Sequence, residues 1–102
     1  MELEGVYLGT DLKYKLEITS PGFSMADDDF DVYLRRGSQI VHIPKNEAIQ
    51  DGDDWYICFN SEALGRGMVK AIIVAHVPDT DFEDGIRDEV MVIDNFLNLM
   101  SI

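Results

Sequence analysis

The sequence is short of cysteine, of basic residues and of long apolar runs, and each shortage excludes a class of protein. Cys58 is the only cysteine, so no disulfide can form within the chain and no cysteine-based metal site is implied. The longest apolar run, residues 71–75, is far too short to span a bilayer. Residues 1–20 alternate polar and apolar side chains, so we expect no signal peptide.

Basic residues are outnumbered, because eight Lys and Arg stand against twenty Asp and Glu, which gives a formal net charge of −12. Such a surface repels phosphate backbones and anionic lipid, so nucleic acid and membrane surfaces are poor partners. Many of the acids gather in three polar segments, residues 27–29, 51–54 and 79–84. This clustering argues against mimicry of the DNA backbone, and solvated loops that keep the domain soluble explain it more simply.

What the sequence has in abundance is apolar side chains at every second position. The 102 residues suit one domain, residues 1–102, and 46% hydrophobic content is ordinary for a globular protein. In residues 12–19 apolar positions alternate with Lys, Glu and Thr, a pattern typical of a half-buried strand. The apolar set is Leu12, Tyr14, Leu16 and Ile18.

A second stretch of alternation predicts a hairpin. Apolar and polar side chains alternate on both sides of a polar dipeptide at positions 36–37. A turn at this dipeptide places Val32 opposite Val41. The same register places Phe30 opposite Ile43, so apolar side chains match across the pair.

The rest of the chain predicts further short strands. They are an aromatic strand at 55–60, an apolar strand at 68–77 and a strand at 89–96, with one helical turn at 61–65. We expect the aromatic strand in the centre of a sheet and the 68–77 strand to be buried on both faces. Six to seven strands with frequent loops predict an all-β fold, an antiparallel immunoglobulin-like β-sandwich, with a small β-barrel as the alternative.

The residues with reactive side chains do not assemble into a recognisable reaction centre. Cys58 lies between apolar neighbours, so we expect a buried small hydrophobe. His42 is expected to pair with Asp31 across the hairpin, and neither His42 nor His76 belongs to a metal-ligand pair in sequence. We therefore predict no enzyme, no catalytic residue and no cofactor.

The third acidic segment resembles the start of a calcium loop without completing one. Asp79 and Asp81 have the alternate spacing of an EF-hand. However, Asp84 stands where that loop requires Gly, and Val90 stands where the closing Glu belongs. Asp79, Asp81 and Asp84 stay weak calcium candidates.

Two features suggest contacts with a protein partner. Tyr33 and Arg35 could project from the wet face of the hairpin, and both residue types are enriched at interfaces. The C-terminal tail is the second feature, and it either forms a last strand that closes the core or docks on a neighbouring subunit. Its apolar residues are Phe96, Leu97, Leu99, Met100 and Ile102.

Two segments carry a family resemblance. They are the turn LGRG at Leu64–Gly67 and the segment Pro78–Arg87, within VPDTDFEDGIRDE, where the long apolar strand ends. With the strand layout over residues 7–94, the chain resembles small immunoglobulin-like phage and prophage proteins of Bacteroides-type bacteria. It is also similar to the N-terminal domain of phage baseplate upper proteins. The resemblance implies a structural part of a tail or baseplate, made in the bacterial cytoplasm and incorporated in a virion.

These observations give two functional hypotheses. The first is a non-enzymatic structural or interaction module that self-associates or binds the subunits of a larger assembly. The alternative is a ligand-binding sandwich for calcium or carbohydrate, which would use the acidic loops with Trp55 or Tyr33 as a platform.

Overall fold

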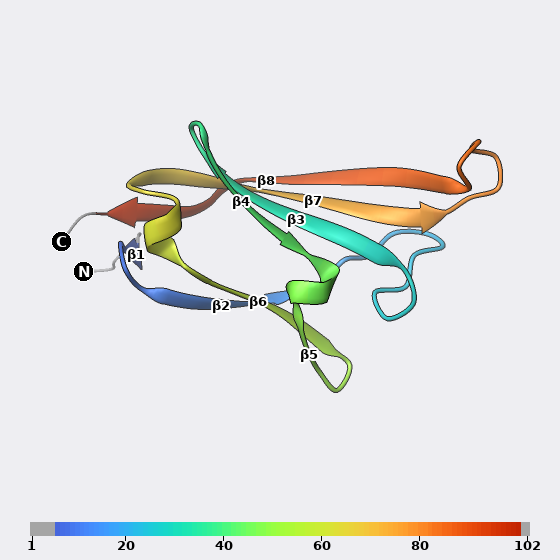
Figure 1. Ribbon diagram of the computed structural model, residues 1–102, viewed down its shortest axis with the longest axis horizontal. Helices are drawn as coiled ribbons and strands as arrows, with labels where there is room; N and C mark the ends of the chain where they lie inside the picture. Colours follow the sequence, from blue (N-terminus) through green and yellow to red (C-terminus); the bar gives the residue numbers. More distant parts are fainter. Residues whose placement is uncertain (1–5, 101–102) are drawn as a thin grey trace.

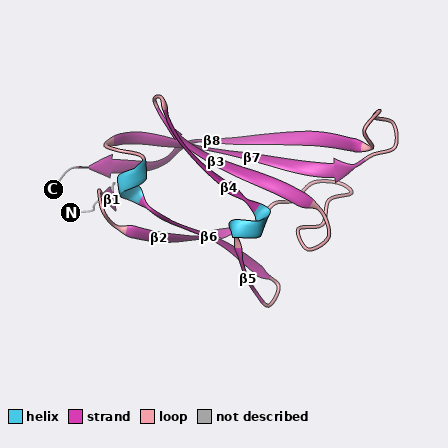
Figure 2. Cartoon of the chain, viewed as in Figure 1, coloured by secondary structure: helices cyan, strands magenta, loops and turns pink. Residues whose placement is uncertain are grey.

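The computed structural model describes residues 6–100, which form two packed β-sheets and no α-helix (Figures 1 and 2). The larger sheet has the order β1-β8-β7-β3-β4, with bounds Val6–Tyr7, Ile86–Met100, Gly67–Pro78, Asp29–Arg36 and Gln39–Pro44. The smaller sheet has the order β2-β6-β5, with bounds Asp11–Leu16, Asp54–Asn60 and Ile49–Asp51. All pairings are antiparallel except β1 with β8, which confirms the predicted antiparallel sandwich.

Alternating side chains of both sheets meet in one core. In β3 the inward positions Phe30, Val32 and Leu34 are almost fully buried. The Phe30 ring stands edge-on to Trp55 of β6, with 5.7 Å between ring centroids. Burying one such large side chain stabilises the fold by about 1.5–3 kcal/mol. The other buried apolar residues are Leu16, Ile18, Ile43, Ile57, Leu64, Val69, Ala71, Ile73, Ala75, Val77, Leu97 and Leu99.

The predicted hairpin is β3 and β4, but its turn lies one residue later than expected. Val32 pairs with Ile43, and Leu34 pairs with Val41. The turn therefore falls at positions 37–38, where Gly37 adopts a φ of +56°. Glycine in the first position of a two-residue turn is what type II′ requires. The register differs by two residues from the prediction, so the inward face stays the same.

The long strand β7 lies inside the larger sheet, between β3 and β8, but the prediction that both its faces are buried is wrong. Every second residue from Val69 to Val77 is buried, whereas Ile72 and Val74 on the opposite face are half-buried. Within residues 6–100 there is no third layer over this outer face. Its apolar side chains are partly covered by neighbours in the same sheet.

The strand β8 is much longer than the predicted strand at 89–96, because the C-terminal tail continues it to Met100. Leu97 and Leu99 are buried, so this part of the tail closes the core. The pairing with β7 shifts register opposite Lys70, where Asn95 adopts a φ of +56°. Asparagine tolerates this left-handed conformation better than most residues. Ile102 lies outside the described residues.

Candidate interaction surface

The outer edge of β8 is open over most of its length. β1 pairs only with Leu99 and Met100. From Ile86 to Asn98, no other strand of the described chain lies on this side of β8. Figure 1 shows β7 and β8 running side by side well past the ends of β2 and β6. Backbone donors and acceptors on such an edge are available to another extended chain.

Apolar side chains on both faces of β8 are exposed beside this edge. On the outer face, Val90 is 59% exposed and Val92 is 52% exposed. On the inner face, Ile93 is 44% exposed, although its position in the alternation points it toward the core. The sequence signal was present in the apolar residues at four consecutive positions, 90–93, and the prediction did not use it.

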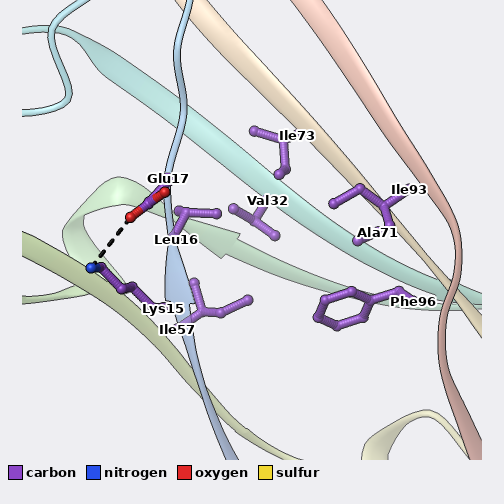
Figure 3. Close-up of a pocket in the computed structure, with 9 residues that line it drawn as sticks. All are labelled: Lys15, Leu16, Glu17, Val32, Ile57, Ala71, Ile73, Ile93 and Phe96. Atoms are coloured by element: carbon purple, nitrogen blue, oxygen red, sulfur yellow. Dashed lines mark ion pairs between the residues drawn. The ribbon is translucent and has the colours of Figure 1, made fainter.

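A cleft of about 440 Å³ opens between the sheets, bordered by β2 and β8 (Figure 3). Its lining residues are Lys15, Leu16, Glu17, Val32, Ile57, Ala71, Ile73, Ile93 and Phe96. Seven of these nine are apolar, and the exceptions are Lys15 and Glu17, which form an ion pair at one side of the cleft in Figure 3. The volume lies within the range of ordinary ligand and peptide sites.

An aromatic contact holds the two sheets together beside the cleft. The ring of Phe96 on β8 lies 4.9 Å from the ring of Tyr14 on β2, centroid to centroid. Tyr14 also stacks on Phe59 of β6 at 6.1 Å. Phe96 is therefore positioned by packing, and it presents one side to the cleft.

Lys15 beside the cleft and Arg87 on β8 are each already paired with two carboxylates. Lys15 lies 3.3 Å from Glu17 and 3.3 Å from Asp54. Hydrogen bonds to Glu17 and then Asp54 raise the pKa of Lys15 above its usual range. Arg87 of β8 is bonded to Asp79 at 2.6 Å and to Glu89 at 3.0 Å. The surroundings of the β8 edge thus carry an excess of negative charge.

A second polar feature crosses the outer face of the larger sheet. His42 Nε2 lies 2.7 Å from one oxygen of Asp31, and His76 Nε2 lies 2.8 Å from the other. His76 Nδ1 in turn lies 2.7 Å from Asp88. These four residues, which we call the His–Asp chain, connect β4, β3, β7 and β8 in that order. None of them lines the cleft.

The His–Asp chain shifts two pKa values. Burial acts to raise the pKa of Asp31, but hydrogen bonds from His76 and His42 outweigh it and hold the pKa below its usual range. Hydrogen bonds to Asp31 and then Asp88 raise the pKa of His76, against a smaller opposing effect of burial. A protonated His76 between two carboxylates is the form that this geometry favours.

The structure shows the predicted contact between His42 and Asp31, at a diagonal rather than a directly opposite position. In the register, Tyr33 is the residue opposite His42, and the two rings stack 4.5 Å apart. Tyr33 is half-buried, and Arg35 beside it donates to the carbonyl of Gly37 at 3.0 Å. The part played by His76 needed the long-range pairing of β3 with β7, which local sequence does not give.

Two expectations about β6 are wrong. Cys58 is exposed, because Trp55 and Ile57 fix the inward phase of the strand and Cys58 falls on the opposite face. Trp55 is only 8% exposed and packs on Phe30, so it offers no open platform for a sugar ring. The ammonium group of Lys45 covers the Trp55 ring at 5.4 Å.

The acidic loop between β7 and β8 uses its carboxylates internally. The backbone N–H of Asp81 and the guanidinium of Arg87 both donate to Asp79, and together they hold its pKa below the usual range. Asp84 accepts from the backbone N–H of Ile86 at 3.2 Å. In residues 6–100 no three His, Cys, Asp or Glu side chains are grouped so as to hold a metal ion. Asp79, Asp81 and Asp84 are part of the loop's own hydrogen bonding.

Comparison with known proteins adds no relative. No family model, no curated protein and no solved structure matches the chain. Within the described residues, no helix is long and apolar enough to cross a membrane.

Proposed function

We propose that this chain is a non-catalytic protein-binding module that accepts an extended segment of a partner along the free edge of β8. The observation that carries the proposal is the open edge from Ile86 to Asn98, with exposed apolar side chains on both of its faces. Natural sheets shorten, charge or cover their edges, since an open edge invites pairing with another chain. An added strand would satisfy the edge and cover both faces at once.

Strand addition divides affinity and specificity between two kinds of contact. Hydrogen bonds between the two main chains supply affinity, and alternate side chains supply specificity. One set of partner side chains would enter the cleft beside Ile93 and Phe96. The other set would lie beside Val90 and Val92 on the outer face. The cleft and the exposed valines are then two sides of one binding site.

The strand order supports an immunoglobulin-like module with an open side. The order β8-β7-β3-β4 against β2-β6-β5 follows the order G-F-C-C′ against B-E-D of immunoglobulin sandwiches. In those sandwiches a further strand, A, lies beside B, which corresponds to the free edge of β2. The cleft lies on this same side. The disulfide of antibody domains has no counterpart, because the chain has one cysteine.

The wider setting that we propose is a subunit of a bacterial phage or prophage tail or baseplate. Its support is the resemblance carried by Leu64–Gly67 and by the segment that follows β7. Assemblies of this kind need small domains that join neighbours without catalysis. The exposed position of the His–Asp chain, on an open sheet face outside the cleft, is consistent with a structural role for its histidines.

A screen with matched edge variants tests the proposal. The wild-type chain is incubated with a yeast-displayed library of random twelve-residue peptides, and enriched peptides are tested against Ile93→Lys and Ile40→Lys. Both replaced isoleucines are exposed, but Ile93 lies on β8 and Ile40 lies on β4.

We expect enriched peptides to lose at least about tenfold in affinity for Ile93→Lys and to bind Ile40→Lys normally, because an inward lysine blocks strand addition. Circular dichroism would confirm that both variants are folded. Peptides that bind all three proteins equally, or a screen that enriches none, would contradict the proposal.

A further inference from the structure

We infer that the segment received by β8 is cationic, with apolar side chains in its centre and Lys or Arg at both ends. This inference rests on the proposed function and names the chemistry of the partner. It comes from the order of side chains along the two faces of β8 and from the charges around the cleft.

The outer face of β8 has two apolar residues between two carboxylates. Along this face the order is Asp88, Val90, Val92 and Asp94. The side chains of Asp88 and Asp94 are 57% and 70% exposed, so both can meet a further cation. Because side chains of a strand recur on one face every second residue, the matching partner face has a cation, two small or β-branched residues and a second cation.

The inner face of β8 begins with Arg87 and Glu89, which bond each other, and is apolar from Met91 onward. Met91 packs against the core and Ile93 is exposed to the cleft. Phe96 and, across the cleft, Leu16 of β2 complete an apolar surface. Partner residues that point inward therefore alternate with the outward ones and are apolar, since a buried unpaired polar group costs stability.

The existing ion pairs exclude an acidic partner. Lys15 beside the cleft, Lys70 and His76 on β7 and Arg87 on β8 are each already bound to at least one carboxylate. Lys15 and Arg87 each meet two. A carboxylate brought to this edge would find like charge and no cation without a partner of its own.

The same charge argument disfavours a second copy of this chain as the occupant. Each copy carries a formal net charge of −12. Its own β8 has three acids, Asp88, Glu89 and Asp94, against one Arg87 between Ile86 and Asn98. Pairing two such edges concentrates like charge, whereas a basic segment removes it.

A pair of synthetic peptides tests the inference. The first is Lys-Leu-Thr-Val-Thr-Leu-Lys, which places Lys, Thr, Thr and Lys on one face and Leu, Val and Leu on the other. The second replaces both lysines with glutamates, and both peptides have blocked ends. Affinities are measured by fluorescence anisotropy with the full chain at 50 mM and 500 mM salt.

We expect the lysine peptide to bind at least about tenfold more tightly at low salt, and this preference to shrink at high salt because screening weakens exposed charge pairs. Asp94→Asn should weaken the lysine peptide about twofold to fivefold. Asp51→Asn on β5 removes the same charge far from β8 and should leave the affinity unchanged.

The outcomes separate this inference from the proposed function. If both peptides bind with equal affinity and Ile93→Lys abolishes both, strand addition stands and the cationic preference is wrong. If the glutamate peptide binds more tightly, the inference is also wrong. If neither peptide binds and the random library enriches none, both the inference and the proposed function fall.

Discussion

The larger sheet is bounded by β4 on one side and, over most of its length, by β8 on the other, and these two edges differ in structure. β4 is six residues long and ends at Pro44, and η1, Lys45–Glu47, follows it directly. Lys45 bonds the carbonyls of Ala26 and Asp28, at 3.0 Å and 2.7 Å, which ties this corner to a neighbouring loop. β8 is fifteen residues long, lacks proline and has exposed apolar side chains on both faces.

The two edges differ in how far they are closed to pairing with another chain. A short strand, a terminal proline and an adjoining loop are the usual ways of closing an edge to other chains. β4 has all three. β8 has none of these three features between Ile86 and Asn98, and it has charged side chains at Asp88, Glu89 and Asp94 and a register shift beside Asn95 instead. The strand addition that we propose would occupy this open edge.

The largest expected effect is on the free energy of unfolding, and it distinguishes the buried core from the cleft beside β8. Phe30→Ala should lower the free energy of unfolding by about 3–5 kcal/mol, because Phe30 is fully buried and its loss leaves a cavity beside Trp55. Ile93→Ala should cost less than about 1 kcal/mol, because Ile93 is 44% exposed and its surroundings are already open. Urea unfolding followed by circular dichroism measures both. Equal losses would mean that the cleft is filled in solution.

A smaller effect concerns the His–Asp chain, which connects the two edges across the outer face. Because the pKa of His76 is raised from 6.5, its protonated form adds stability below pH 6.5, and this is lost as the pH rises through the higher folded value. Because the pKa of Asp31 is lowered from 3.8, its ionised form adds stability above pH 3.8, and this is lost as the pH falls through the lower folded value. The contribution of the chain is therefore largest between these limits.

Thermal unfolding at a series of pH values measures this dependence. We expect about 1 kcal/mol or less, since all four side chains are partly exposed. His76→Gln should flatten the loss of stability above pH 6.5 and also reduce the loss at low pH, because the hydrogen bond from His76 is the largest cause of the lowered pKa of Asp31. A wild-type stability that does not change between pH 5.5 and 8 would contradict the ionic arrangement.

The smallest expected effect is on the rate of self-association, which we compare between variants of the β8 edge and of the β4 edge. In 1 M salt the repulsion between chains of charge −12 is screened, so slow association through β8 becomes possible. Val92→Lys should reduce it, and Ile40→Lys on β4 should not. Light scattering over time compares the three proteins. Equal suppression by both lysines would place the cause in net charge rather than in one edge.

Local alternation predicted the strands, because side-chain phase is a short-range property. The apolar positions of β2, the face of the β3–β4 hairpin and the aromatic strand β6 between two neighbours all follow from it. The predictions that were wrong concern properties that depend on how strands pack against one another. Cys58 is exposed because of the phase that Trp55 sets, and Ile72 is only partly covered because there is no further layer over β7 in the described chain.

Prediction of the candidate site would have required knowledge of contacts between segments still farther apart in the sequence. Whether β8 is an edge depends on how far β1 extends along it, and β1 covers only two residues. The cleft exists because β2 and β8, distant in sequence, border the same open side. Tyr33 and Arg35, which their residue types suggested, lie on the outer face of β3, and among the tail residues up to Met100 only Phe96 lines the cleft.

The most direct test of strand addition is nuclear magnetic resonance of the labelled chain bound to a peptide enriched by the screen. We predict cross-strand contacts between peptide protons and backbone protons of residues 86–97, in the regular pattern of paired strands, with new protection of β8 amides from hydrogen exchange. Contacts confined to β4, to the acidic loops or to the outer His–Asp chain would contradict the account.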